Sequence, residues 1–404
     1  MTYVRVLLVM VECVVASGLA AAGPPLTVAP TLGQCGAQFT RIQDAIAAAA
    51  PNGTIRVCAG VYDEQLHITK SLTIIAEPDV VIRPSAAAVN GTSLSSGNAF
   101  ASIIFVENAE NVILRGFTVD GVSSAPIACA PRFLGVTYQN ASGEMEDLDI
   151  QNIRLANRLN GCQSGTGVLV QSGNRLSSNV TIKRNRLSTY QKNGITADGT
   201  GTYVSILKNR VTGLGPTPGA AQNGIQIGFG STGKVEHNTI SENQWSPCVS
   251  TTECAAFATG ILVVQSDDVI VRNNASHSNQ VNIFSDGERT TIERNLVLDA
   301  VVFDGIQIQG PRAKVEENTI ARADEAGINV FGDYPVVRFN RFLDCPIGIL
   351  ESAPVVGAIF DPNVFIDVDQ NIVVVGNADG APATVGARKE AIRPNNPAVP
   401  SPDM

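Results

Sequence analysis

Seven polar residues in the middle of the chain have the types and spacing expected of a ligand-binding surface. Six of them occupy alternate positions after a recurring Gly-apolar pair, so they should point to one side of successive strands. The seventh is a lysine at a bend beside them. Amides and carboxylates, with an occasional aromatic, suit a ligand rich in hydroxyl groups, such as a sugar. The residues are Lys192, Asp198, Gln226, Asp286, Gln307, Gln309 and Asn329.

The same pattern also fits an ordinary wetted sheet face with ladders of amides, and Lys192 also fits a solvated bend. Hydrolysis of a glycosidic bond would need two carboxyl groups about 5–10 Å apart. Asp198 and Asp286 are about three repeats apart, or roughly 14 Å if the repeats stack as strands do. The sequence therefore identifies no catalytic residue and leaves open whether the protein is an enzyme.

A repeat whose later steps are 21–23 residues long positions these side chains. The segments between repeat markers, such as "GIQIG" and "KVEHNTI", alternate apolar and polar residues with period two and lack helical periodicity. This predicts coils of a parallel β-helix, with apolar ladders inside and an Asn column bonded from coil to coil. The glycine markers are Gly167, Gly194, Gly224, Gly260, Gly305, Gly327 and Gly348. The Asn column is Asn185, Asn209, Asn238, Asn273 or Asn274, Asn295, Asn318 and Asn340.

The ends of the chain differ from the repeats. Residues 1–22 have a positive start, an apolar run and small residues near Ala22, which predicts a signal peptide. Residues 23–50 form an N-terminal segment whose Ala-rich stretch, "FTRIQDAIAAAA", predicts a short helix that covers the open edge of the first coil. We expect the β-helix over 51–378, with about ten or eleven coils, and a Pro-rich, loosely ordered tail over 379–404.

The stretch "TIRVCAGVYDEQLHITKSLTI" resembles the first coil, and "YQKNGI" with "NGIQIGFG" the middle coils, of secreted right-handed parallel β-helix proteins of the pectin-lyase-like superfamily. The resemblance covers about residues 35–375. It implies an all-β fold, a single-stranded right-handed parallel β-helix with an N-terminal capping helix. It also implies a polysaccharide partner, by default one containing uronate. An enzyme of this kind would be a polysaccharide lyase or a glycoside hydrolase; the alternative is a non-enzymatic structural or periplasmic accessory scaffold.

The signature motifs of the superfamily's pectin methylesterases and alginate epimerases are not found in the sequence. Of the polygalacturonase motifs only the Asp-Asp pair has a counterpart, Asp267 and Asp268, which also fits a solvated turn. A β-elimination would need a Lys or Arg base. Basic residues beside the Asn column would form a stripe suited to a polyanion, but interleaved glutamates favour a solvated face that pairs its own charges. The stripe is Arg184, Lys208, His237, Arg272 and Arg294, and the glutamates are Glu236, Glu293, Glu316 and Glu317.

A formal charge of −9 and a pI near 5.0 argue against nucleic acid as a partner. No stretch after the signal is apolar for long enough to cross a bilayer, so we expect a soluble protein, secreted or periplasmic. Its cysteines lack zinc-site spacing and suggest the disulfides Cys35–Cys58, Cys129–Cys162 and Cys248–Cys254, with Cys345 left buried or free. No metal or cofactor is required, and a Ca²⁺ site among surface aspartates stays open.

Overall fold

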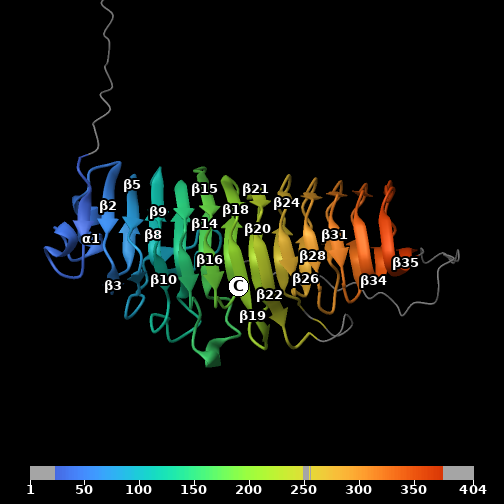
Figure 1. Ribbon diagram of the computed structural model, residues 1–404, viewed down its shortest axis with the longest axis horizontal. Coiled ribbons are helices and arrows are strands. Elements are labelled where there is room, and N and C mark those ends of the chain that lie inside the picture. The colour runs from blue at the N-terminus through green and yellow to red at the C-terminus, as the bar shows by residue number, and fades with distance from the viewer. Residues whose placement is uncertain (1–22, 249–253, 255, 376–404) are drawn as a thin grey trace, which may run out of the picture.

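The computed structural model describes residues 23–248, 254 and 256–375. Strands stack side by side along one long axis, from the helix α1 at one end to the strand β35 at the other (Figure 1). Most coils contribute one strand to each of three faces, and neighbouring strands run parallel except for β7 against β8. The fold is the all-β parallel β-helix that the repeat predicts, with one α-helix in the described part of the chain.

The first face is a sheet of twelve parallel strands. This is slightly more than the ten or eleven coils expected, because β1 precedes the helix and pairs with β2, which extends the sheet at the capped end. The strands are β1 (Leu26–Val28), β2 (Gly53–Val57), β5 (Leu72–Ala76), β9 (Val112–Arg115), β12 (Gly143–Glu146), β15 (Ser178–Lys183), β18 (Thr202–Leu207), β21 (Thr232–Glu236), β24 (Ile270–Arg272), β27 (Thr291–Glu293), β30 (Lys314–Glu316) and β33 (Val336–Arg338).

The second face contains the strands that follow the Asn column in each coil. They are β3 (Gly60–Tyr62), β6 (Val80–Ile82), β10 (Thr118–Asp120), β13 (Asp149–Gln151), β16 (Arg186–Ser188), β19 (Arg210–Thr217), β22 (Thr239–Trp245), β25 (Ala275–His277), β28 (Leu296–Leu298) and β31 (Thr319–Ala321).

The third face contains the Gly-apolar pairs. Its strands are β4 (Leu66–Ile68), β8 (Ala99–Glu107), β11 (Arg132–Gln139), β14 (Thr166–Gln171), β17 (Asn193–Asp198), β20 (Asn223–Gly228), β23 (Thr259–Val264), β26 (Val281–Ser285), β29 (Ile306–Ile308) and β32 (Ala326–Val330). The long strands β34 (Arg341–Glu351) and β35 (Val364–Val374) run through both faces and join them, while β7 (Gly91–Thr92) pairs with β8.

Aliphatic ladders fill the interior. In the third face, Ile195, Ile225, Ile261 and Ile283 lie side by side on consecutive strands, and all are fully buried. Removing such side chains from water is the main stabilising contribution to the fold, at about 25 cal/mol per Å² of apolar surface. The alternation that buries them turns each following residue outward, which is how the scaffold positions its polar side chains.

The Asn column is a continuous hydrogen-bonded ladder. Asn209 donates its backbone N–H and its amide Nδ2 to Asn238 Oδ1 at 2.8 and 2.9 Å, and the same pattern recurs from Asn185 to Asn363. Asn274, not Asn273, occupies the ladder in its coil. Arg272 is also displaced from its expected place, because it lies two residues before the ladder, within β24 and alongside Glu236 and Glu293.

The N-terminal end is closed by α1 (Ile42–Ala48), inside the expected helical stretch. The buried Glu64 carboxylate accepts hydrogen bonds from the backbone N–H groups of Ile42 and Gln43, at 2.8 and 2.9 Å, and so satisfies donors of the first turn. Single 3₁₀ turns occur at Gln34–Gly36 and Asn157–Leu159. The predicted signal peptide (1–22) and tail (379–404) lie outside the described residues.

Three disulfides join Cys35 to Cys58, Cys129 to Cys162 and Cys248 to Cys254, and Cys345 is a buried free thiol. The second and third bridges tie down loops that connect the second face to the third. Among the described residues, no helix is long and apolar enough to span a membrane.

Candidate ligand-binding site

The predicted polar column lies on the outside of the third face, but most of it is buried. Thr196, Gln226, Leu262, Phe284, Gln307 and Asn329 are neighbours on consecutive strands. The column passes through Phe284, because the alternative, Ile283, points into the core. Gln226, Gln307 and Asn329 are only 2%, 1% and 4% exposed. The ordinary wetted sheet face considered above is therefore wrong for this column.

Loops that leave the second face fold back over the third face and enclose a cavity of about 280 Å³. Figure 1 shows these loops, coloured teal to yellow, along one edge of the molecule below β10 to β22. The described residues that line the cavity, which we call the pocket, are Gly161, Gln163, Lys192, Gly219, Ala220, Ala221, Asn223, Trp245, Ala256, Phe257, Thr259, Leu262 and Phe284.

Two aromatic side chains form the apolar wall of the pocket: Trp245, the last residue of β22, and Phe257, in the loop that follows it. The Trp245 indole N–H donates to Gly219 O at 2.9 Å, which fixes the ring across the neighbouring loop. The Phe257 ring centroid lies 5.7 Å from Phe284 and 5.3 Å from Phe303. Held rings of this kind present flat apolar surface at little entropic cost, and Trp and Tyr also suit sites where one edge is wet.

The floor of the pocket is polar and its hydrogen-bond directions are fixed. Thr259 Oγ1 donates to Asn223 Oδ1 at 2.7 Å, and Asn223 Nδ2 donates to Asn193 Oδ1 at 3.1 Å. Asn193 Nδ2 then donates to Thr196 Oγ1 and Gln226 Oε1. At the end of this chain, Gln226, which does not itself line the pocket, has a buried Nε2 donor without a hydrogen-bond partner in the described part of the chain. A buried amide in this state costs about 1–3 kcal/mol unless a ligand or water accepts from it.

Lys192 closes one side of the pocket. Its Nζ donates to Ala221 O at 2.7 Å, and no carboxylate of the described residues lies within ion-pairing distance of it. Burial, with a smaller contribution from the positive charge of Arg132, lowers the pKa of the Lys192 ammonium to about 8. An ammonium has three donors, so this cation has capacity left for a ligand.

The structure separates the other predicted residues. Asp198 lies at the end of β17, where it accepts a hydrogen bond from Ser95 Oγ at 2.7 Å. Asp286 comes three strands later, so the two carboxylates stay apart, as the sequence indicates. Gln307 and Asn329 lie beyond Phe284, and Asn329 Nδ2 donates to Asp304 Oδ2 at 2.9 Å. Gln309, also beyond Phe284, and Asp286 are partly exposed.

The pocket also contains residues that sequence reasoning missed. Trp245 and Phe257 flank the Cys-bridged insertion "SPCVSTTEC", and Asn223 and Thr259 begin their strands just before the glycines. One signal was available: Trp245 is the one tryptophan of the chain and lies in its longest repeat step. The sequence around Trp245 gives no indication that its side chain would lie beside Lys192 and Asn223.

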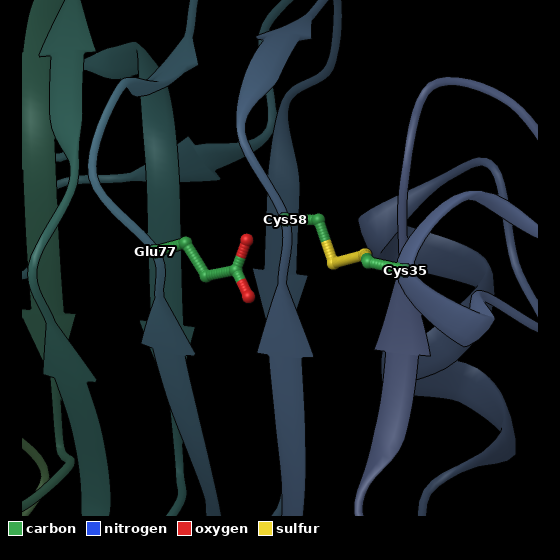
Figure 2. A group of neighbouring side chains, drawn as sticks. All are labelled: Cys35, Cys58 and Glu77. Carbon is green, nitrogen blue, oxygen red and sulfur yellow. A yellow bond between two sulfur atoms is a disulfide. The ribbon is translucent and has the colours of Figure 1, made fainter.

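Acidic and metal-binding groups do not converge on the pocket. None of its described lining residues is Asp or Glu. The one cluster of metal-ligating types among the described residues is Cys35, Cys58 and Glu77, near the N-terminal cap (Figure 2). Its two sulfur atoms are joined in a disulfide, so they are not thiolate ligands. The three arginines of the basic stripe beside the Asn ladder pair with acids, for example Arg294 with Glu317 at 2.7 Å. Lys208 and His237 form no ion pair with a described residue.

Comparison with known proteins agrees with this architecture. A search of curated proteins found no significant match. The native lacto-N-biosidase of Eubacterium ramulus is similar in structure, with a TM-score of 0.60 and 12% identity over 87% of this chain and 68% of that chain. The Dettilon tailspike protein has a TM-score of 0.58 and 15% identity over 84% and 68%. XylC in complex with xylose has a TM-score of 0.50 and 10% identity over 85% and 86%.

These identities are too low to carry more than the fold. The family model for the right handed beta helix region, in contrast, matches the sequence itself, at residues 166–344 and 259–386. The two matches together span 166–386, more than half of the 404 residues. The chain therefore belongs to the right-handed β-helix family, as its resemblance to the pectin-lyase-like superfamily implied.

Proposed function

We propose that this protein binds carbohydrate in the pocket over β20, β23 and β26. The observation that carries the proposal is the combination of a held Trp245 ring, an oriented Asn223–Thr259 floor and a buried cation in one cavity. A sugar ring offers flat C–H surface to the indole and hydroxyl groups to the amide and hydroxyl side chains. The fold is compatible with a sugar ligand, since one similar structure is a lacto-N-biosidase and another is XylC in complex with xylose.

The sugar is acidic in this proposal. A buried ammonium without a carboxylate partner among the described residues is costly in the empty pocket. A uronate carboxylate would supply that partner, and a charge-assisted hydrogen bond contributes about 1.5–3 kcal/mol. A neutral sugar would leave the Lys192 ammonium without a negatively charged partner.

Catalysis is the second candidate, and the pKa of Lys192 is what favours it. Glycoside hydrolysis needs two carboxyl groups, and the described lining contains none. β-Elimination fits better. A neutral Lys192 would take the proton beside the uronate carboxylate, a C=C bond would form, the C–O bond to the next sugar would break, and the leaving oxygen would take a proton from water. A base with a pKa near the working pH suits that step.

The test uses Trp245, because it is the one tryptophan and lines the pocket. The protein is titrated with digalacturonate and with xylobiose while tryptophan emission is recorded, and ultraviolet absorbance of an unsaturated product is followed in parallel. We expect digalacturonate to change the emission, and Lys192→Met to weaken its binding by about 10- to 100-fold. Lys208→Met, an exposed lysine on the opposite side of the coil, is the matched control.

If neither sugar changes the emission or the melting temperature of the protein, the carbohydrate proposal is wrong and the scaffold alternative gains weight. Equal binding of xylobiose and digalacturonate would leave carbohydrate binding standing but refute the role of Lys192. Absence of an unsaturated product at pH 7–9 would refute the elimination.

A further inference from the structure

The pocket is the last in a row of cavities along the same edge of the molecule. Three further cavities, of about 540, 320 and 80 Å³, follow one another there. The first two share Val122 and Ser123, the second and third share Arg154 and Leu155, and the third shares Ala220 with the pocket. Shared lining residues place the four cavities in a row along one edge, and we call this row the edge groove.

The groove is built by the loops between the second and third faces. Successive walls come from the loops after β6, β10, β13 and β19, whose strands pair in the order β6, β10, β13, β16 and β19. Four strand spacings correspond to roughly 19 Å. The Cys129–Cys162 disulfide ties the loop after β10 to the loop after β13, so these two walls are held together. The groove is therefore long enough for several sugar units.

Its lining carries more positive than negative charge. Arg83, Arg154 and Arg158 line it, against one carboxylate, Asp63. Arg83 pairs with Asp120 at 3.8 Å, so Arg154 and Arg158 are the cations available to a ligand. Arg158 Nη2 donates to Ile127 O at 3.2 Å. Arg154 is exposed and has no ion-pair partner in the described part of the chain. The whole chain has a formal charge of −9, so this concentration of guanidinium groups is a local departure from its surroundings.

Apolar surface lies between the arginines. Ile127 is 84% exposed and Val122 is 41% exposed, and both belong to the lining. A surface that alternates guanidinium groups with small apolar patches suits a chain whose units each have an acidic group and C–H faces. Guanidinium also pairs bidentately with carboxylate or sulfate.

We propose that the edge groove binds the continuation of an acidic glycan whose terminal unit occupies the pocket. This rests on the proposed function, and it adds that the ligand is an extended polyanion held by Arg154 and Arg158. Both residues lie outside the pocket, so they should matter only to ligands too long for it. The groups that they recognise are carboxylate or sulfate, which the experiment separates.

The experiment measures dissociation constants from Trp245 emission for digalacturonate, a long oligogalacturonate, a long xylo-oligosaccharide and dextran sulfate, at low and high salt. The variants are Arg154→Gln/Arg158→Gln and, as control, Arg210→Gln. Arg210 is also exposed without an ion pair among the described residues, but it lies at the opposite end of β19 from the groove. Thermal melts confirm that each variant is folded.

We expect the long oligogalacturonate to bind tighter than digalacturonate, with a stronger salt dependence. The double variant should lose roughly tenfold affinity for the long acid, the factor for two exposed ion pairs. The double variant should bind digalacturonate with unchanged affinity. Arg210→Gln should change the affinity for neither the long oligogalacturonate nor digalacturonate. If the protein binds dextran sulfate and not the long oligogalacturonate, sulfate is the group that the arginines recognise.

Equal affinity for long and short acids in the unsubstituted protein overturns the groove, even if the pocket binds sugar. The groove proposal is also wrong if the double variant binds the long oligogalacturonate as tightly as Arg210→Gln does. It is wrong as well if the affinity for the neutral xylo-oligosaccharide rises with chain length as much as the affinity for the acidic chain. Arginine-dependent binding of the long acid without binding of digalacturonate would support the groove and reject the pocket. No binding of any ligand rejects both.

Discussion

Replacement of Lys192 by methionine should stabilise the protein at neutral pH, although it removes a hydrogen bond. Methionine keeps most of the side-chain volume and removes the buried charge. Burial, with a smaller contribution from Arg132, lowers the pKa of Lys192 from 10.5 to about 8. The folded protein therefore binds this proton more weakly than the unfolded chain does, and stability is lost as the pH falls from about 10.5 to about 8.

The magnitude follows from the two pKa values. One pKa unit corresponds to 1.36 kcal/mol, so the charged lysine costs about 3 kcal/mol at pH 7. At pH 9.5 the folded state is mostly neutral while the unfolded chain is still mostly charged, and the cost falls to about 1.4 kcal/mol. Lys192→Met removes this dependence. The substitution also leaves Ala221 O without its donor, and this loss reduces the gain in stability by about 1 kcal/mol at either pH.

Urea unfolding of both proteins at pH 7 and pH 9.5 tests the argument. We expect Lys192→Met to be about 2 kcal/mol more stable than the unsubstituted protein at pH 7, and the advantage to shrink by about 2 kcal/mol at pH 9.5. Lys208→Met should show no such change, because Lys208 is exposed. An advantage that is the same at both pH values would refute the buried, charged state of Lys192.

Three further substitutions test the scaffold and the loop that holds Trp245. Asn238→Ala removes an oxygen that accepts from Asn209 and an amide that donates to Ile206 O; we expect a loss of about 2–4 kcal/mol in urea unfolding, and a neutral effect would contradict the ladder. Gly224→Ala would place a Cβ 2.6 Å from Gly260 O; it should cost about 1–3 kcal/mol, whereas an unchanged melting temperature would mean that the coils can spread. Gln280→Leu removes four hydrogen bonds to the segment between β22 and β23, two accepted by Oε1 and two donated by Nε2. Tryptophan emission should shift to the red and ligand affinity should fall by about tenfold or more, and an unchanged spectrum would mean that these bonds do not hold Trp245 in place.

The coil could be predicted because its rules are local. Each Gly-Ile pair places an isoleucine inside, and the next residue must then point out, so Gln226 and Gln307 were placed correctly from alternation alone. The Asn ladder follows from the same repetition, since identical turns stack in register. Its one ambiguity, between Asn273 and Asn274, came from two adjacent asparagines that satisfy the same pattern.

The pocket could not be predicted in the same way, because burial of an outward side chain depends on which loop covers it. Gln226 and Gln307 are almost fully buried although they face away from the core. The path of the Trp245 loop is decided by contacts far apart in sequence, such as its indole N–H with Gly219 O. The alternation of apolar and polar residues predicts whether a side chain points inward or outward. It does not predict which loop covers an outward side chain.

The division between coil and loop also explains how a regular scaffold holds an irregular site. Gln280 comes from the coil, just before β26, and its buried amide bonds both sides of the loop: Oε1 accepts from Trp245 and Ala258 N–H groups, and Nε2 donates to Trp245 and Cys248 carbonyls. The described ends of the loop, at Trp245, Cys248 and Ala258, are therefore held by the stack beneath them as well as by the disulfide. Because the stack is rigid, ordering of the pocket is already achieved before a ligand arrives, and less binding free energy is spent on it. The same arrangement lets loops of unequal length line one edge without disturbing the ladders inside.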